Sequence, residues 1–257
     1  MKILLTNDDG VDAPGLKALS ECLQHTLRSR GSLEQCDVLV VAPNRCRSEC
    51  GHSLESIRPL QVTEVSPRWH AVAGTPVDCV RVALQAMSFA PDVVFSGVNA
   101  GANLGINLLV SGTFAAAREA ALQGVPAMAI SHYRRPDVAK LWDHTPLWLE
   151  QTIGEFLDVA QGYDQRVPSL SAPLWNVNLP AIEPQSGWVP PRVECAVDRK
   201  PLDRAGVVGE DGTVHFELDF HARPRENGRD VDHCFSGAIT LSKVDPHFGL
   251  GGETSVD

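Results

Sequence analysis

Short apolar runs alternate with longer stretches in which apolar residues recur at helical spacing. The runs of buried-strand type are 2–6, 37–42, 93–95, 126–131 and 174–179. The stretches with helical spacing are 15–27, 76–87, 111–122 and 146–159. Strands that alternate with helices predict a parallel sheet, so we expect an α/β fold with a Rossmann-like, three-layer core.

The pattern changes after about residue 182, where prolines and charges become more frequent and helical periodicity disappears. Short β runs occur at 213–218 and 238–244. We therefore expect two parts, an α/β catalytic core over 1–181 and an extended β-rich appendage over 182–257. The appendage is suited to contacts between subunits. Within the core, the runs 60–65 and 69–73 predict a hairpin.

Composition excludes several classes of function. The chain has 257 residues, 43% of them hydrophobic, which is enough for a packed core. A net charge of −10 gives no attraction for a nucleic-acid polymer or an anionic membrane. No apolar run reaches the ~18 residues of a membrane span, and no signal-peptide pattern is found, so we expect a cytoplasmic protein. The seven cysteines are scattered, and Cys46 and Cys50 have no second Cys/His pair at zinc spacing.

Polar clusters follow four of the predicted strands. Ligands of a doubly wound sheet bind beyond the carboxyl ends of its strands. The clusters are Asn7–Asp9, the loop 43–53, the segment 96–99, and Ser131 with His132. We expect the first three to converge on one edge of the sheet.

Asp8 and Asp9 form an adjacent acidic pair at the end of the first strand. Two close carboxylates repel each other unless a cation or a proton lies between them. Together with serine and asparagine oxygens they suit Mg²⁺, Mn²⁺ or Ca²⁺ better than zinc. A solvated turn or a helix cap is the alternative, since aspartate is common in both.

The sequence Ser111-Gly112-Thr113 opens a helix after a glycine-rich loop. Backbone N–H groups and the helix dipole favour an anion there, although an ordinary Ser/Thr cap is an equal alternative. The motifs G-x-G-x-x-G, G-x-x-x-x-G-K-[ST] and G-x-S-x-G are absent, which disfavours dinucleotide, P-loop and serine-hydrolase functions. Arg45, Arg47 and His52 share one loop and either meet a phosphate or base, or form a solvated face.

Several blocks in the first 180 residues resemble one family in the order in which they occur. They are ILLTNDDGVDAPG (3–15), VVAPNRCRS (40–48), GHSL (51–54), GTPVDCV (74–80), SGVNAGANLG (96–105), SGT (111–113) and NVNLP (176–180). Together they resemble the SurE family of metal-dependent nucleotide phosphatases.

The resemblance implies a site, a cofactor and an assembly. The implied ligands of one divalent ion, Mg²⁺ or Mn²⁺, with Ca²⁺ as a substitute in a crystal, are Asp8, Asp9, Ser48 and Asn99. Asp8 and Asp9 would also be catalytic, and the implied phosphate cradle is Asn103, Ser111, Gly112 and Thr113. The implied substrates are nucleoside 5′-monophosphates, with 3′-monophosphates as an open further class. A C-terminal extension exchanged between subunits implies a homodimer or homotetramer.

The chain departs from the family pattern near the proposed ligands. Glu49 stands where a glycine is usual, and Ile106 lies where acidic residues are common. A non-catalytic or weakly active nucleotide-binding protein is therefore an alternative. A second alternative, an aspartyl-phosphate phosphatase, usually has an aspartate two residues after the first, and here that position is Gly10.

Overall fold

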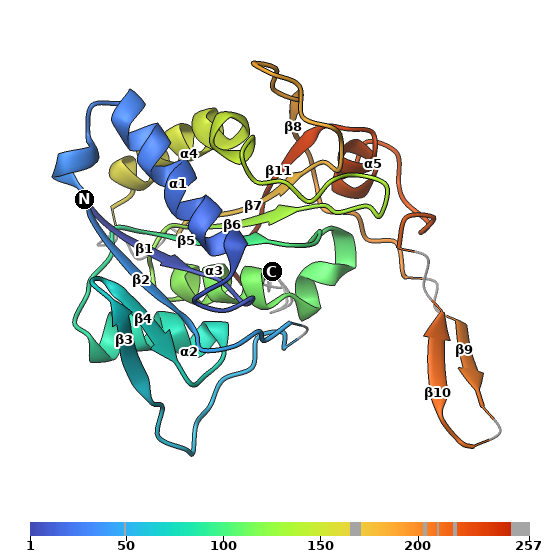
Figure 1. The fold of residues 1–257 in the computed structure, drawn as a ribbon, viewed down its shortest axis with the longest axis horizontal. Coiled ribbons are helices and arrows are strands. Elements are labelled where there is room, and N and C mark those ends of the chain that lie inside the picture. Colours follow the sequence, from blue (N-terminus) through green and yellow to red (C-terminus); the bar gives the residue numbers. More distant parts are fainter. Residues whose placement is uncertain (49, 165–170, 203–204, 210, 218–219, 248–257) are drawn as a thin grey trace, which may run out of the picture.

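A nine-stranded, mostly parallel sheet forms the centre of the molecule (Figure 1). The computed structural model describes residues 1–48, 50–164, 171–202, 205–209, 211–217 and 220–247. The strand order is β3-β4-β2-β1-β5-β6-β7-β11-β8. The strands are β1 (Lys2–Thr6), β2 (Asp37–Pro43), β3 (Val62–Ser66), β4 (Trp69–Val72), β5 (Val93–Asn99), β6 (Ala127–His132), β7 (Leu174–Leu179), β8 (Arg192–Glu194) and β11 (Ile239–Lys243). Strands β4, β2, β1, β5, β6 and β7 run parallel to their neighbours in that order, which confirms the predicted α/β fold.

Helices cover both faces of this sheet. They are α1 (Pro14–Ser29), α2 (Pro76–Arg81), α3 (Gly112–Leu122), α4 (Thr145–Gly162) and α5 (Asp230–Phe235). Side chains alternate across a strand. Ile3, Leu5 and Phe95 accordingly pack in one cluster with residues of α1 and α4. Leu4 and Val94 pack in a second cluster with residues of α2 and α3, so the core has three layers.

The predicted elements of the core agree with the structure to within a few residues. The helix expected over 76–87 is an α-helix to Arg81 and continues as a π-helical turn over Val82–Ala86. The 3₁₀ helix η3 (Gly105–Val110) was not predicted. Its apolar residues Leu108, Leu109 and Val110 lack a clear helical period because the segment makes less than two α-helical turns.

The segment after residue 181 contributes to the core sheet. Strand β11 pairs antiparallel with β7, and β8 pairs parallel with β11. The short helix α5 lies in a segment where the sequence indicated no helix. Strands from both sides of residue 181 therefore belong to one sheet.

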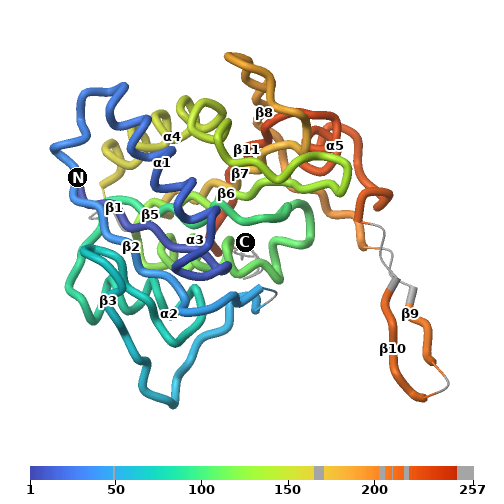
Figure 2. The backbone as a smooth tube through the Cα atoms, in the orientation of Figure 1, coloured from blue at the N-terminus to red at the C-terminus, as the bar shows by residue number. Residues whose placement is uncertain are grey.

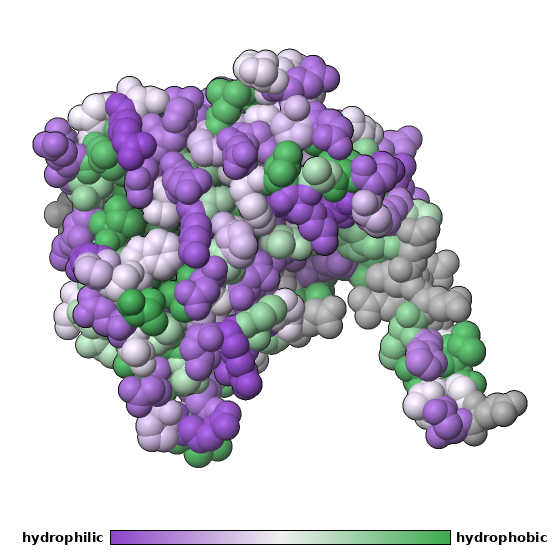
Figure 3. Space-filling model, in the orientation of Figure 1, coloured by the Kyte–Doolittle hydropathy of each residue, from purple (hydrophilic) through white to green (hydrophobic). Residues whose placement is uncertain are grey.

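One hairpin of this segment projects from the body of the molecule (Figures 1 and 2). It consists of β9 (Ala205–Val208) and β10 (Val214–Glu217), paired antiparallel. Apolar side chains on it are exposed, as the green atoms of the projecting arm show in Figure 3. They are Val207, Val208, Val214 and Phe216. The part of the chain that the structure describes contains no helix that could span a membrane.

Candidate functional site

Three segments meet at the carboxyl edge of the sheet because β1 lies between β2 and β5. All three strands are parallel, with Leu5 in register with Val40 on one side and with Phe95 on the other. Their carboxyl ends therefore open onto the same edge. This arrangement places the Asp8-Asp9 pair between the loop that carries Ser48 and the end of β5 at Asn99.

Asn7 shapes the turn that carries the two aspartates. Its side-chain Nδ2 donates to the carbonyl of Gly10 at 2.9 Å, and its Oδ1 accepts from the Gly10 N–H at 3.2 Å. Gly10 has a φ of +111°, a conformation that side chains rarely adopt. This side-chain turn stops the strand, so Asp8 and Asp9 no longer have to point to opposite faces.

Asp8 is buried against the start of α3. Its Oδ1 accepts a hydrogen bond from the Thr113 hydroxyl at 2.5 Å. Burial raises the pKa of Asp8 to about 6 although this hydrogen bond and the nearby Thr113 backbone lower it, and the charge of Asp9 raises it further. A residue in the first turn of α3 therefore forms a direct hydrogen bond with this carboxylate.

Asp9 is tied to the loop after β5. Its Oδ2 accepts from the Ala100 N–H at 3.2 Å, while burial raises its pKa. The amide nitrogen of Asn99 donates to the carbonyl of Gly101 at 2.9 Å, which leaves Oδ1 as the atom that a cation would use. Asp9 and Asn99 therefore lie on contacting loops.

The loop that carries Ser48 contacts the acidic turn through the neighbouring Arg47. The Arg47 N–H donates to the Asp8 carbonyl at 2.7 Å, which fixes the loop after β2 against the acidic turn. The Ser48 side chain is exposed, and its Oγ lies 3.0 Å from the Cys46 Sγ. Glu49, the residue that departs from the family pattern, lies outside the described residues.

The oxygen donors at this edge fit a hard divalent cation. Among the described residues, Asp8 and Asp9 take part in no ion pair, so their two charges lack a basic partner. In the same part of the chain no three His, Cys, Asp or Glu side chains form a metal site. The candidate set instead completes two carboxylates with the Ser48 hydroxyl and the Asn99 amide, and oxygen donors of this kind are the ones that Mg²⁺ and Mn²⁺ prefer.

The proposed phosphate cradle has a different internal arrangement from the one expected. Ser111 caps α3, since its Oγ accepts from the Phe114 N–H at 3.0 Å. Thr113 is fully buried and directs its hydroxyl to Asp8. Gly112 lies so close that a Cβ there would be 2.8 Å from the Asp8 Cβ. The Ser111 hydroxyl therefore caps α3 and the Thr113 hydroxyl orients Asp8. The backbone N–H of Gly112 remains the donor suited to a ligand.

Asn103 is held by an amide network at the carboxyl edge. Its Nδ2 donates to the Ser131 Oγ at 2.8 Å, and its N–H donates to the Asn178 Oδ1 at 2.9 Å. Its carbonyl accepts from the side chains of Asn176 and Asn178, each at 3.0 Å. Asn176 and Asn178 point to the same face of β7 because they are two residues apart. This network was not expected, although two buried asparagines at this spacing in an apolar strand indicate it.

The basic side chains of the Ser48 loop lie in different surroundings. His52 Nε2 lies 2.9 Å from the Glu119 Oε2, so this histidine anchors the loop to α3. Arg45 and Arg47 line a hollow of about 360 Å³ that also contains Arg58. This hollow lies beside the loop after β2.

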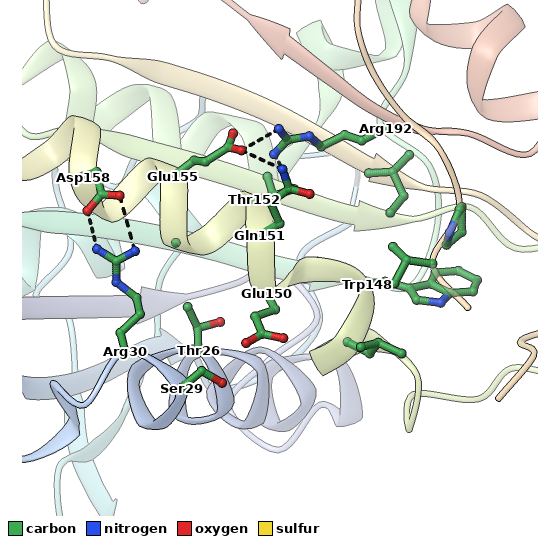
Figure 4. A pocket seen from close by; sticks show the side chains of 15 residues that line it. Thr26, Ser29, Arg30, Trp148, Glu150, Gln151, Thr152, Glu155, Asp158 and Arg192 are labelled. Atoms are coloured by element: carbon green, nitrogen blue, oxygen red, sulfur yellow. Dashed lines mark hydrogen bonds and ion pairs between the residues drawn. The ribbon is translucent and has the colours of Figure 1, made fainter. Parts of the chain in front are cut away.

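A hollow of about 740 Å³ lies elsewhere, between α1 and α4 (Figure 4). Figure 4 shows Arg30 facing Asp158 and Arg192 facing Glu155, and both are ion pairs. Thr26 also lines this hollow. It is separated from Gly15, at the start of α1, by eleven residues, or ~17 Å at the rise of an α-helix. None of the candidate site residues lines this hollow.

A family model described as Survival protein SurE matches residues 3–193. The chain belongs to the SurE family. A protein of Nostoc sp. strain PCC 7120, provisionally named a 5′-nucleotidase, is 37% identical over 247 residues, which are 95% of this chain and 99% of that protein. A Geobacter metallireducens protein named 5′-nucleotidase SurE is 49% identical over 132 residues, 51% of this chain and 49% of that one.

The crystal structure of the SurE protein from Aquifex aeolicus has the same fold. It is superposed with a TM-score of 0.73 and 25% sequence identity over 96% of this chain and 94% of that chain. The SurE fold thus extends beyond residue 193 and includes the strands that return to the sheet at the C-terminal end.

Proposed function

We propose that this SurE-family chain is a divalent-metal-dependent 5′-nucleotidase. It would release phosphate from nucleoside 5′-monophosphates, with 3′-monophosphates as further substrates. One observation carries the proposal: two carboxylates with no basic partner among the described residues lie at the carboxyl edge of the sheet. Asp8 is bonded to the first turn of α3, and the loops that carry Ser48 and Asn99 contact the acidic pair through Arg47 and Ala100. The nucleotidase names of the similar Nostoc and Geobacter proteins support the substrate class.

The proposed ligands of the cation are Asp8, Asp9, Ser48 and Asn99. A bound Mg²⁺ or Mn²⁺ supplies positive charge toward the phosphoryl oxygens and makes a water molecule more acidic. This local charge matters because the chain as a whole carries −10 and repels anionic substrates.

The side chains of the site supply proton transfer and phosphate binding. Asp8 or Asp9 accepts the proton of the attacking water, and the Thr113 hydroxyl keeps the Asp8 carboxylate in place. The start of α3 at Gly112 and the side chain of Asn103 hold the phosphate and stabilise the charge that develops on it. Hydrolysis by water needs no covalent phosphoenzyme.

Phosphate release from 5′-AMP tests the proposal. The protein is freed of metal with EDTA, and activity is measured before and after addition of Mn²⁺ or Mg²⁺, with 3′-AMP as a second substrate. We expect activity to disappear with EDTA and to return with the cation. Tight binding of 5′-AMP without turnover under all of these conditions would instead support the non-catalytic nucleotide-binding alternative.

A further inference from the structure

The loop that carries Asn103 is gripped by two charged side chains from the C-terminal segment. The Gly105 N–H donates to the Asp230 Oδ2 at 2.8 Å, and the Arg223 Nη1 donates to the Leu104 carbonyl at 3.4 Å. Asp230 is 0% exposed and Arg223 is 3% exposed. Both side chains are separated from the loop by more than 115 positions in the sequence, so the contact is purely tertiary.

Asp230 is itself fixed from two further directions. Its Oδ1 accepts from the N–H of Asp198 at 2.8 Å and from its neighbour Val231 at 2.9 Å. Burial raises the pKa of Asp230, while these N–H donors and that of Gly105 lower it. A buried carboxylate is costly unless its oxygens are well bonded, and here backbone donors meet both of them.

The grip leaves no space for a side chain on the loop. Gly105 has a φ of +56°, and a Cβ there would lie 2.8 Å from the Arg223 Nη2 and 3.1 Å from the Asp198 carbonyl oxygen. The Arg223 Nε and Nη2 have no hydrogen-bond partner among the described residues. This guanidinium therefore stays in place through packing and the nearby charges of Asp198 and Asp230, which raise its pKa against the effect of burial.

The opposite side of the loop is held by the core. Asn103 bonds to Asn176 and Asn178 of β7 and to Ser131 of β6. Residues 103–105 are thus fixed between the sheet on one side and the C-terminal segment on the other. The loop continues directly into η3 and then into Ser111, so its position also sets the approach to α3.

We propose that Asp230 is a positioning residue for phosphate binding, assisted by Arg223. By fixing the backbone of Leu104 and Gly105, it holds the Asn103 side chain at the phosphate subsite. The inference rests on the proposed function of that site. Because Asp230 and Arg223 both follow the projecting hairpin in sequence, the segment beyond the hairpin becomes part of the active-site framework.

Asp230→Asn tests the proposal, with Asp232→Asn as the matched control. Asp232 lies on the same helix but accepts from the Gly228 N–H at 2.9 Å and pairs with Arg225. A single amide oxygen cannot serve both Gly105 and the donors of Asp198 and Val231. We expect kcat/KM for 5′-AMP to fall about tenfold in Asp230→Asn, mainly through KM, with Mn²⁺ affinity unchanged. The inhibition constant of inorganic phosphate should rise in parallel, and Asp232→Asn should match the wild type.

Amide hydrogen exchange over residues 101–106 gives a readout that does not depend on turnover. Exchange there should accelerate in Asp230→Asn and not in Asp232→Asn. If Asp230→Asn does not fold, Arg223→Lys tests the same grip, with a smaller rise of KM expected. An unchanged KM, or equal losses of Mn²⁺ affinity and phosphate affinity, would overturn the proposal. A wild-type protein that shows no metal-dependent turnover would instead refute the proposed function, and the exchange data would still report on the grip.

Discussion

The Thr113 hydroxyl donates a hydrogen bond to the Asp8 carboxylate, with 2.5 Å between Oγ1 and Oδ1. This contact joins the turn after β1 to the first turn of α3 across 105 positions of sequence. The Thr113 hydroxyl orients a metal-ligand candidate, whereas the family resemblance implied that Thr113 belongs to the phosphate cradle. The proposed cation site and the proposed phosphate site therefore share one helix N-terminus.

Replacing Thr113 by valine should weaken the cation site. The substitution removes the hydroxyl donor to Asp8 and preserves the volume, and the loss of such an outer-shell partner lowers metal affinity by about 10–100-fold. Titration calorimetry with Mn²⁺ measures the effect. Thr113→Ser keeps the donor and serves as the control. Equal affinity in the valine and serine variants would show that the hydroxyl does not support the site.

Replacing Gly112 by alanine should displace Asp8. The added Cβ would lie 2.8 Å from the Asp8 Cβ and 3.1 Å from its Oδ2, and both distances are too short for a relaxed contact. We expect kcat/KM for 5′-AMP to fall by at least about tenfold, the size of effect expected for misplaced catalytic groups. Gly162→Ala is the control because a Cβ at Gly162 meets no atom within 4 Å. Full activity of Gly112→Ala would contradict this arrangement.

The strand ends could be predicted from the sequence because they depend on local patterns. The apolar run followed by Asn7-Asp8-Asp9 defines where β1 stops, whereas β5 continues beyond its apolar run through Ser96 to Asn99. Parallel topology then brings the two ends together. The structure adds the strand order, which places β1 between β2 and β5. The candidate ligands were thus accessible from periodicity, chemistry and family resemblance.

The inner contacts of the site could not be predicted, because they depend on tertiary packing. No local pattern says that Ser111 caps α3 while Thr113 turns toward Asp8. Strand β8 and helix α5 escaped prediction because three and six residues carry too little periodicity. Asp230 could not be predicted as a site residue because its partner Gly105 lies 125 positions away in the sequence.

Stability should decrease as the pH falls below about 6.5, because His132 is buried with no ion-pair partner among the described residues. Burial lowers the pKa of His132 from 6.5 to about 3, and the neighbouring charges of Arg134 and His144 lower it further. The unfolded chain takes up this proton near pH 6.5, whereas the native protein does so only near pH 3. The contribution is therefore complete above pH 6.5 and is lost as the pH falls toward 3.

Urea unfolding at pH 7 and pH 4.5 measures this dependence. We expect His132 to account for a loss of roughly 2–3 kcal/mol in the free energy of unfolding between these values. His132→Phe should show a smaller difference between the two pH values, whatever its stability at pH 7. His215→Gln, a change at an exposed position of β10, should retain the wild-type difference. An equal difference in the free energy of unfolding between the two pH values for His132→Phe and the wild type would disprove the assignment to His132.

We propose that the projecting hairpin mediates a homodimer or homotetramer. The exposed fractions of Val208 and Phe216 are 68% and 72%, and exposed apolar side chains gathered on one arm are typical of an interface. Light scattering coupled to size exclusion should find a larger species for the wild type and a monomer for the double variant Val208→Glu, Phe216→Glu. An unchanged mass in that variant would place the interface elsewhere.

Asp9→Asn tests the cation site and the proposed chemistry most directly. Asp12→Asn is the matched control, because Asp12 is exposed three positions further along the same turn region. Release of phosphate from 5′-AMP at saturating Mn²⁺ is compared across the wild type and both variants, with circular dichroism as a check of folding. We expect no detectable metal-dependent activity in folded Asp9→Asn and wild-type activity in Asp12→Asn. Full activity in Asp9→Asn would contradict a site built on the Asp8-Asp9 pair.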